Sequence, residues 1–555
     1  MDRKYIDFHI KENVTYNNLL INGSTVTTNR SDIGNIGMVS SAKYEASQIG
    51  SKIIKNGGNA FDAAVATGFA LSVCEPNASG LGGGGLMTAK KGITNEYIFV
   101  DFREIAPGNA YDGMWKTDSK GKALYAEKSE GGKSVCIPGE VAGLCYILAK
   151  YGTMTIKEVL KPVIDLAQNG IIVSAQLKND LDENREKMNE FYESGNVYVE
   201  KYEIGDKLIN EALIKTLEII SLKGEDSFYR GELTNRMIDS INFFGGDVSY
   251  EDFSNYRVNE INPLRGSYRG FEIISSPPPS SGGTHIIEIL NILEEFNLSS
   301  MGLNSLEHIH LLSETFKTCF ADRAKYMGDS KFTKIPIKGL ISKEYAKEKT
   351  KEIKKDRVNK YDYGNPFLYE PTDTTHYSIA DNKGNLVSIS KTISSFFGSG
   401  IVPKNTGIIL NCQMRGFADK SGQTNSVSGY KKPLSSMSPS IVLKDNEPFA
   451  LLGSPGGNRI ITSVSQVISN LIDFDMDIES AINSPRIHNE CDGILHYESR
   501  IENKIIKELE RMGQITNSLG KWDRYVGGVQ GIRILGNKTF IGAADPRREG
   551  KAIGC

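Results

Sequence analysis

The sequence has little cysteine, and its cysteines and histidines lack the spacings that hold metals. Seven cysteines in 555 residues form no CxxC pair, and their number is odd. This pattern argues against a disulfide framework and a zinc site, and indicates reduced, mostly buried thiols. His308 and His310 are two residues apart, which places them on different sides of a helix, so we interpret them as structural. We therefore expect no metal and no cofactor. The cysteines are Cys74, Cys136, Cys145, Cys319, Cys412, Cys491 and Cys555.

The sequence also lacks a long hydrophobic run and a strong charge of either sign. Its most apolar stretch, Ala60 to Cys74, has the length of a buried core helix and is too short to span a bilayer. The charged start, Met1 to Ile10, has no apolar region of the kind that a signal peptide needs. We expect a cytoplasmic protein, with export by another route left open. A net charge of −3 gives no reason to expect nucleic acid or a membrane as a partner.

Length and glycine content indicate a large protein with tight backbone contacts. A chain of 555 residues exceeds one ordinary core, so it forms two or more domains or one large intertwined domain. Its 56 glycines, roughly 10% against an average near 7%, cluster in short loops. We interpret those loops as places where backbone segments approach closely.

The first half of the chain is rich in helical patterns. Residues 1–36 are polar and are expected to form an arm on the surface. Ser40 and Ser41 are expected to cap a helix that Asn56-Gly57-Gly58 ends. The remaining predictions are a helix over Ala60 to Cys74, a strand over Glu96 to Phe102, helices in much of 139–240 and 283–330, and a rigid turn at Pro277 to Gly283.

The second half of the chain has a different pattern of predicted elements, in which short strands alternate with helices. A Lys/Glu-rich stretch from Lys343 to Lys360 predicts a solvated helix. The predicted strands are His376–Ala380, Leu386–Ser390, Gly407–Leu410, Ser440–Leu443, Phe449–Leu452, Gln530–Leu535 and Thr539–Ala543, and the predicted helices are 459–473, 477–483 and 501–512. Strands and helices in mixed order indicate stacked α and β layers.

Thr374 opens the run Thr374-Thr375-His376-Tyr377-Ser378, directly after a loop that ends at Asp373. A threonine freed as a new N-terminus becomes a nucleophile, because its own α-amine lies close enough to take the hydroxyl proton. A Thr-Thr pair after a turn is more often only the start of a strand. The segment alone leaves both interpretations open.

Two later segments carry groups that suit amide chemistry. Gly453-Ser454-Pro455-Gly456-Gly457 precedes a helix near Arg459, and glycine amides at a helix N-terminus can donate to an oxyanion. The alternative is an ordinary strand-to-helix turn. Ser435 and Ser436 present adjacent hydroxyls that can hold a carboxylate or cap a turn.

Taken together, these segments resemble the γ-glutamyltransferase (glutathione hydrolase) family over nearly the whole chain, from about Gly37 to Pro546. The resemblance implies an N-terminal-nucleophile hydrolase with an α+β, αββα sandwich fold. It also implies self-cleavage into a large subunit, 37–373, and a small subunit, 374–555, intertwined in one domain. The matching motifs are Gly57-Gly58-Asn59-Ala60, Gly80 to Gly84, Asp101-Phe102-Arg103-Glu104, Pro277 to Gly283, Ala321-Asp322-Arg323, Thr374 to Ser378, Asn411 to Met414, Leu434 to Pro439, Gly453 to Gly457 and Asp545-Pro546-Arg547.

The resemblance also implies roles for individual residues. Thr374 would cut the Asp373–Thr374 bond and then serve as the catalytic nucleophile, and the Thr392 hydroxyl would support the freed N-terminus. The other implied groups are the oxyanion-hole glycines Gly456 and Gly457, the carboxylate-binding residues Arg103, Ser435 and Ser436, and the amine-binding residues Gln413 and Ser394. Arginine suits carboxylate binding because its planar fork bonds in a bidentate way.

The chain departs from the family pattern around the substrate amine. The family usually has Asn at Ser394 and Asp at Gly416, and here Arg415 adds a positive charge beside Gly416. Losing the aspartate removes a charge-assisted hydrogen bond worth roughly 1.5–3 kcal/mol. Asp419 is a nearby acid that remains open as a substitute. The segment from Gly416 to Ser435 is also shorter than in members with a lid loop, so we expect a more open site that admits bulkier or polymeric substrates.

Three hypotheses follow. The favoured one is a self-processing γ-glutamyl hydrolase or transferase that acts on glutathione or related γ-glutamyl amides through a Thr374 acyl-enzyme. The second keeps the fold and nucleophile, but acts on a carboxylate-bearing amide that lacks the α-amine. The third is a nucleotide-binding protein in which Gly80 to Gly85 cradle phosphate, which the missing Lys-Ser/Thr after those glycines disfavours.

Overall fold

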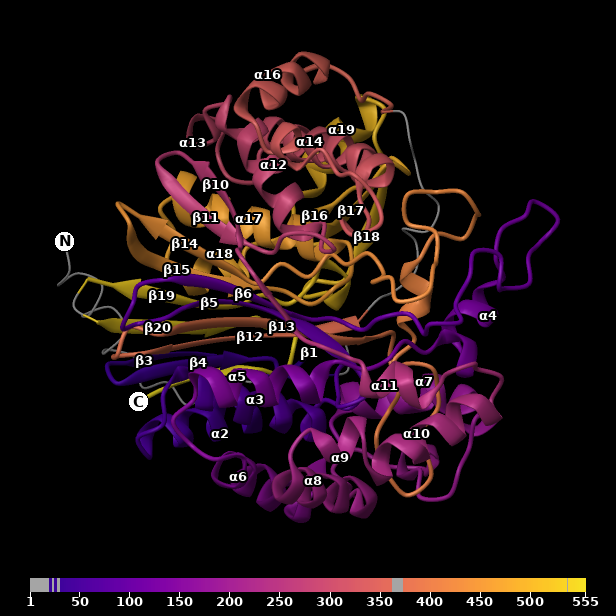
Figure 1. The fold of residues 1–555 in the computed structure, drawn as a ribbon. Helices are drawn as coiled ribbons and strands as arrows, with labels where there is room; N and C mark the ends of the chain where they lie inside the picture. Colours follow the sequence, from indigo (N-terminus) through magenta and orange to yellow (C-terminus); the bar gives the residue numbers. More distant parts are fainter. Residues whose placement is uncertain (1–18, 22–23, 27–29, 362–372, 537) are drawn as a thin grey trace.

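The computed structural model of the chain describes residues 19–21, 24–26, 30–361, 373–536 and 538–555. Two seven-stranded antiparallel sheets stack face to face, and helices cover the outer face of each sheet (Figure 1). This is a four-layer αββα sandwich, so the predicted fold class is confirmed. Among the described residues, no helix is both long and apolar enough to cross a membrane.

The first sheet runs in the order β10-β11-β14-β15-β19-β20-β3, and the second in the order β21-β4-β12-β13-β5-β6-β9. The strands of the first are β10 (Leu264–Tyr268), β11 (Phe271–Ser275), β14 (Ser440–Lys444), β15 (Glu447–Gly453), β19 (Gln530–Leu535), β20 (Thr539–Ala544) and β3 (Ser31–Gly34). Those of the second are β21 (Lys551–Gly554), β4 (Gly37–Ser41), β12 (Asp373–Asp381), β13 (Leu386–Ser394), β5 (Gly84–Lys90), β6 (Tyr97–Phe102) and β9 (Asn259–Ile261). Smaller sheets contain β1 (Leu19–Ile21) with β2 (Ser24–Val26), β7 (Ile171–Ile172) with β8 (Lys207–Leu208), and β16 (Ile487–His488), β17 (Ile494–Glu498) and β18 (Ile515–Leu519).

Each sheet has its own helical cover. The second sheet packs against helices from the first half of the chain: α2 (Tyr44–Lys55), α3 (Ala60–Cys74), α5 (Glu140–Tyr151), α6 (Ile156–Asn169), α7 (Ala175–Glu190), α8 (Glu211–Lys223), α9 (Asp226–Tyr229), α10 (Glu232–Phe243) and α11 (Tyr250–Ser254), with α4 (Tyr125–Ser129) at one end. The first sheet packs against α12 (Gly282–Glu294), α13 (Leu298–Met301), α14 (Leu306–Tyr326), α15 (Ile337–Leu340), α16 (Lys343–Glu352), α17 (Arg459–Asp473), α18 (Ile478–Asn483) and α19 (Asn503–Arg511).

Helix α3 shows how local sequence sets this architecture. Asn59 caps it by accepting hydrogen bonds from the backbone of Phe61 and Asp62, and the Asp62 side chain accepts from the Asn59 backbone in return. Every residue of α3 is buried, so the helix has no polar face. It therefore lies directly on the second sheet, as its apolar sequence predicted.

Alternation along β12 decides what faces the space between the sheets. Tyr377 and Ile379 belong to the core beneath α3. Ser378 points the other way and donates to the carbonyl of Gln530 in the first sheet at 3.1 Å. Because successive residues of a strand alternate in direction, Thr374 shares the inter-sheet side with His376 and Ser378.

Strands from before and after Thr374 are interleaved in both sheets. In the second sheet β12 and β13 lie between β4 and β5, and in the first sheet β14 and β15 follow β11. Separate domains on the two sides of Thr374 are therefore absent from the described chain.

Several predicted elements differ from the structure. Ser31–Gly34 of the expected surface arm forms the edge strand β3, which pairs with β20. Ser40 and Ser41 end β4 and do not cap α2, which begins at Tyr44 after Lys43. The helix predicted from Lys343 ends at Glu352, and the following chain turns so that the Lys354 carbonyl accepts from His310 at 2.7 Å.

The strand predicted at Gly407–Leu410 is wrong. This apolar run satisfies its backbone through isolated contacts: Leu410 bridges Gly82, and the amide of Ile408 donates to the Thr406 hydroxyl at 3.2 Å. Apolar β-branched residues here reflect burial in a packed loop, which periodicity alone does not distinguish from a buried strand.

Candidate active site

Thr374 lies where the pairing of β12 with β13 becomes irregular. Asp373 is opposite Ser394 and Thr375 is opposite Lys391, so β13 has one more residue than β12 between these pairs. Ser394 takes a φ of +84°, a left-handed conformation that is unusual for serine. Its amide donates to the Thr392 hydroxyl at 2.8 Å. Such bulges re-aim side chains next to active sites.

A cavity of about 340 Å³ opens beside this bulge. That size falls within the range of about 300–1,000 Å³ that small-molecule sites occupy. Of the nine residues predicted to act in catalysis or binding, eight line it: Arg103, Thr374, Thr392, Ser394, Gln413, Ser435, Ser436 and Gly457. The ninth, Gly456, is the neighbour of Gly457 and is not among the lining residues. Parts of the chain more than 350 residues apart in sequence thus meet at one point.

His376, although it follows Thr374 closely, is not placed to act as its base. Its Nδ1 lies 2.8 Å from the Ser390 hydroxyl and its Nε2 lies 3.1 Å from the Ser378 hydroxyl. Burial lowers the pKa of His376 to about 3, so the ring stays neutral. His376 is therefore not a candidate base for Thr374, and the α-amine that the resemblance implies is the remaining expectation.

The turn before α17 has the geometry of an anion-binding site. Gly456 and Gly457 have φ values of +124° and +57°, which glycine adopts without strain. Asn458 follows, and α17 begins at Arg459, so the amides of this turn lie at a helix N-terminus. The partial positive charge there favours an oxyanion.

Arg103 is held in place before any ligand binds. It is 1% exposed, and its Nη1 lies 2.7 Å from the Glu104 carboxylate. With the Gln413 amide oriented to satisfy both neighbours, Gln413 accepts from Arg103 Nη2 at 2.9 Å and donates to the Ser394 hydroxyl at 2.9 Å. Arg103 Nε has no hydrogen-bond partner among the described residues. Burial raises the pKa of Glu104, and the Arg103 charge opposes that rise.

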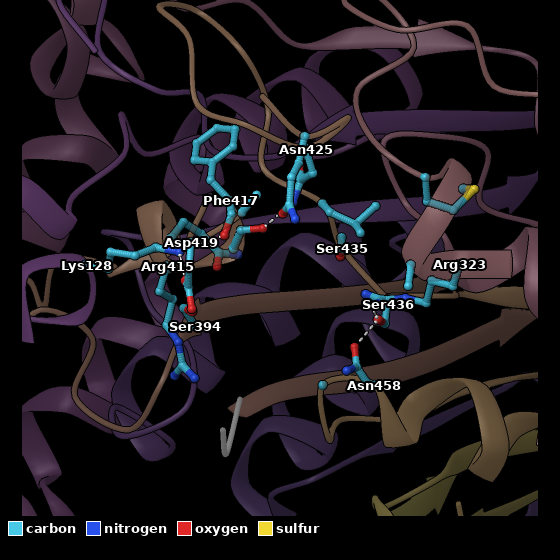
Figure 2. Close-up of a pocket in the computed structure, with 18 of the residues that line it drawn as sticks. Lys128, Arg323, Ser394, Arg415, Phe417, Asp419, Asn425, Ser435, Ser436 and Asn458 are labelled. Carbon is cyan, nitrogen blue, oxygen red and sulfur yellow. Dashed lines mark hydrogen bonds and ion pairs between the residues drawn. The ribbon is translucent and has the colours of Figure 1, made fainter. Parts of the chain in front are cut away.

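Ser435 and Ser436 are fixed by the Pro277 to Gly283 turn, but their hydroxyls differ. The Ser435 carbonyl accepts from the Ser281 amide at 2.8 Å and from the Ser281 hydroxyl at 2.7 Å. The Ser435 hydroxyl accepts from the Met437 amide at 3.1 Å and keeps its own proton to donate. The Ser436 hydroxyl donates to the Asn458 side-chain oxygen at 3.1 Å (Figure 2).

The side of the cavity that the resemblance assigns to a substrate amine has no acid at Gly416, and Asp419 does not replace it. Asp419 forms an ion pair with Lys128, a lysine that is 3% exposed, and lies 3.5 Å from Lys122. Lys128 also donates to the Phe417 carbonyl at 2.7 Å. The negative charge of Asp419 is therefore neutralised within the wall, and Arg415 lines the same side (Figure 2).

Comparison with known proteins agrees with this geometry. The family model described as gamma-glutamyltranspeptidase matches residues 46–555. The chain belongs to the gamma-glutamyltranspeptidase family. The resemblance found in the sequence is thereby confirmed, as is its consequence that the protein is an enzyme of this class.

Relatives within and near the gamma-glutamyltranspeptidase family carry two kinds of name. The chain is 39% identical to a glutathione hydrolase proenzyme of Bacillus subtilis (strain 168), covering 94% of this chain and 92% of that protein. It is 35% identical to an acylase ACY 1 proenzyme of Pseudomonas sp. (strain V22), covering 94% of each. The fold matches the crystal structure of cephalosporin acylase from Bacillus halodurans with a TM-score of 0.87 at 24% identity, over 98% of both chains.

The glycine-rich loop at Gly80 to Gly85 is explained by packing. A Cβ at Gly83 would lie 2.1 Å from the Thr392 carbonyl oxygen, and one at Gly82 would lie 2.2 Å from the Ile409 carbonyl oxygen. The loop is buried against β13, beside Thr392, and does not form an open phosphate cradle. The nucleotide-binding hypothesis is therefore not supported.

Sequence reasoning gave no role to several residues of the cavity wall, among them Arg323, Lys128 and Asn458. Arg323 stood in a quoted motif, Ala321-Asp322-Arg323, but was given no role, and Lys128 and Asn458 stood in none. The motif was the available signal for Arg323. The loop before Thr374, residues 362–372, lies outside the described residues, as does the side chain of Asp373 at the predicted cleavage site.

Proposed function

We propose that the protein is a self-processing γ-glutamyl hydrolase and transferase that cleaves the γ-glutamyl amide of glutathione or related compounds through an acyl-enzyme on Thr374. One observation carries the proposal: Thr374, Arg103 and Gly457 come from three distant segments and line one cavity. These are a nucleophile, a carboxylate-binding group and an oxyanion-binding turn, the three parts that such a reaction needs. The glutathione hydrolase proenzyme relative supports the same reaction.

In the proposed maturation step the Thr374 hydroxyl attacks the carbonyl carbon of Asp373. The peptide C–N bond breaks as the ester C–O bond forms, and the proton moves to the new amine. Water then hydrolyses the ester, which separates the large subunit, 37–373, still joined to the arm 1–36, from the small subunit, 374–555. The interleaved strands of the two sheets keep the subunits together after the cut.

In turnover the freed α-amine of Thr374 takes the hydroxyl proton while the oxygen attacks the γ-carbonyl of the substrate. The negative charge on the carbonyl oxygen is stabilised by amides of the Gly456-Gly457 turn at the start of α17. The C–N bond of the amide then breaks, and the leaving amine takes the proton. Water or an acceptor amine releases the acyl group from Thr374.

Arg103 and the Ser435 hydroxyl hold the acyl carboxylate in this scheme. Arg103 is pre-oriented by Glu104, and Ser435 keeps a proton to donate. Fixing the carboxylate places the γ-carbonyl at the nucleophile, so these contacts contribute to the rate as well as to affinity.

Trapping the acyl-enzyme tests the proposal. Purified protein is mixed with γ-glutamyl p-nitroanilide, quenched in acid and measured by intact mass spectrometry. We expect the small subunit to gain the mass of one glutamyl residue, on the peptide that begins at Thr374, and an acceptor such as glycylglycine to shorten the lifetime of the adduct. Release of nitroaniline with the label on any other residue contradicts the assignment of Thr374.

The second candidate is an acylase of the same fold for a carboxylate-bearing amide without an α-amine. Two observations favour it: Gly416 offers no charge to an ammonium, and Asp419 is already paired with Lys128. The acylase ACY 1 relative supports this chemistry in a related chain. In the trapping experiment a glutaryl anilide would then label Thr374 more efficiently than the γ-glutamyl compound.

A further inference from the structure

Arg323 is one of three arginines in the cavity wall, with Arg103 and Arg415, and none of the roles described above uses it. It comes from α14, is 8% exposed, and lines the cavity with Thr374 and Gly457. Its Nε donates to the Ser281 hydroxyl at 2.8 Å and its Nη2 donates to the Ser436 hydroxyl at 3.1 Å. Figure 2 shows Arg323 beside Ser436, on the side of the cavity away from Arg415.

The charge of Arg323 has no carboxylate of the described chain in direct contact with it. Within the part of the chain that the structure describes, no Asp or Glu forms an ion pair with it. Asp322 is engaged by Lys349 at 3.1 Å and by the Tyr345 hydroxyl at 2.8 Å. Glu490 lies 2.8 Å from His488 and acts on Arg323 only from beyond ion-pair distance. Burial lowers the pKa of Arg323 to about 10, so it remains a cation at neutral pH.

Arg103 differs from Arg323 in this respect. Glu104 forms an ion pair with Arg103 at 2.7 Å and is itself fully buried, so the two charges cancel. A buried charge that is not cancelled is unfavourable, and an arriving anion relieves it. Of these two arginines, Arg323 is therefore the one without an ion-pair partner among the described residues.

The position of Arg323 suits the same carboxylate that Ser435 and Ser436 are expected to hold. The Ser436 hydroxyl accepts from Arg323 and donates to Asn458, so its only proton is committed. Through Ser281, Arg323 is also joined to the Ser435 carbonyl. A carboxylate that accepts the Ser435 proton would thus lie next to the Arg323 guanidinium.

We propose that Arg323 is a specificity-determining residue of the carboxylate subsite, supplying the net positive charge that selects a carboxylate over a neutral carboxamide. Arg103 orients the carboxylate through its hydrogen bonds but adds little net charge, since its own charge is matched by Glu104. The inference rests on the proposed function, because it concerns the acyl carboxylate of that substrate class.

A substrate pair that differs in one charge tests this role. The pair is γ-glutamyl p-nitroanilide and the same compound with its α-carboxylate replaced by a carboxamide. The wild type should prefer the carboxylate. Arg323→Gln should reduce that preference about tenfold or more, through a higher KM for the carboxylate substrate. The kcat/KM for the carboxamide substrate should change less than about threefold. Rates are normalised to the processed fraction on a denaturing gel.

Two control variants separate charge from structure. Arg323→Lys keeps the cation and should retain most of the preference. Ser281→Ala removes a hydroxyl partner of Arg323 without removing charge, and should also retain the preference even if both rates fall. If Arg323→Gln lowers kcat/KM equally for both substrates, or leaves the preference for the carboxylate intact, the proposal is overturned.

A failure of the proposed function is distinguishable from a failure of this inference. Should the wild type cleave no γ-glutamyl anilide, the same comparison uses glutaryl p-nitroanilide and its carboxamide. Should it cleave neither acyl group, thermal shifts with glutarate and with glutaramide replace the kinetics. Glutarate should then raise the Tm of the wild type and of Arg323→Lys, but not that of Arg323→Gln. Equal shifts in all three proteins overturn the role of Arg323.

Discussion

The cavity has two halves, which the proposed function assigns to the carboxylate and to the amine of a substrate. The two halves differ in the charged side chains that line them. The carboxylate half has Arg103 buried against Glu104, Arg323 without an ion-pair partner in the described chain, and Ser435 with a proton to donate. The amine half has Ser394 in a strained conformation and a glycine at 416. One half presents buried arginines and a hydroxyl proton to a ligand, whereas the other presents no carboxylate at position 416.

The acids that do line the cavity do not compensate for this absence. Asp419 is paired with Lys128. Asp118 is exposed and accepts from the amides of Lys120 and Lys122, and these hydrogen bonds lower its pKa. Under the proposed function, the cavity combines a nucleophile, an oxyanion-binding turn and carboxylate-binding groups, while position 416 sets which acyl group is accepted.

The largest effect concerns the nucleophile that both halves serve. Thr374→Ala should leave one full-length chain and reduce amide cleavage by at least about 10⁴-fold, since the same hydroxyl performs maturation and turnover. Denaturing gels and nitroaniline release measure the two effects. Thr374→Ser, the control, should mature slowly. An alanine variant that still matured into two fragments would show that another group makes the cut.

Removing Arg103, which is expected to hold the carboxylate, should have the next largest effect on activity. Arg103→Ala should lower kcat/KM about 100-fold, because the unheld carboxylate misplaces the scissile carbonyl. It should also lower the free energy of unfolding by about 3–5 kcal/mol, because Glu104 is left as an unpaired buried charge. Steady-state kinetics and denaturant titration measure these. Unchanged kinetics would mean that no carboxylate binds at Arg103.

Placing an acid at Gly416 tests the difference between the two halves of the cavity directly. A Cβ at Gly416 would lie 3.1 Å from Pro433 Cβ and 3.3 Å from the Leu434 carbonyl oxygen, so a side chain needs only a small adjustment. If the substrate carries an ammonium, Gly416→Asp should raise kcat/KM for γ-glutamyl p-nitroanilide about tenfold. Gly416→Ala, which adds the Cβ without the charge, should not.

The same variants on a glutaryl anilide distinguish the two candidate functions. For a natural substrate without the amine, the wild type should prefer the glutaryl compound, and Gly416→Asp should slow its turnover through repulsion. A wild type that already prefers the γ-glutamyl compound by orders of magnitude contradicts the acylase alternative, and points to main-chain carbonyls as the acceptors of the ammonium.

The smallest effect concerns Ser394. Its φ of +84° is more readily adopted by asparagine than by serine. Ser394→Asn should therefore raise the free energy of unfolding by about 0.5–1 kcal/mol, measured by denaturant titration. Ser394→Ala keeps the strained backbone and removes the hydroxyl that accepts from Gln413, so it should lower stability. A loss of stability in the asparagine variant would contradict the strain argument.

Local signals predicted much of the fold. Helix α3 and strand β19 were predicted to the residue, because a capped apolar run and a bounded strand pattern are properties of the segment itself. The failure at Gly407–Leu410 has the opposite cause, since Gly82, which bridges Leu410, is distant in sequence. The cytoplasmic location and the cleavage site stay predictions.

The candidate site was likewise predicted only in part from the sequence. Motif resemblance located Thr374, Arg103 and Ser435, which the structure places around one cavity. It gave no role to Arg323 and missed Lys128, whose partner Asp419 is 291 residues away in sequence. Glu104 follows Arg103 directly in the sequence, but that the two side chains pair, and that Arg323 has no such partner among the described residues, is a property of the folded packing.

The most direct test of the account is the intact mass and N-terminal sequence of the purified protein. We predict two polypeptides that elute together in size exclusion, with the smaller one beginning at Thr374. The catalytic assignment requires this free α-amine, because no histidine lies in position to replace it among the described residues around Thr374. A fully active single chain of 555 residues, or a cut at any other bond, would contradict it.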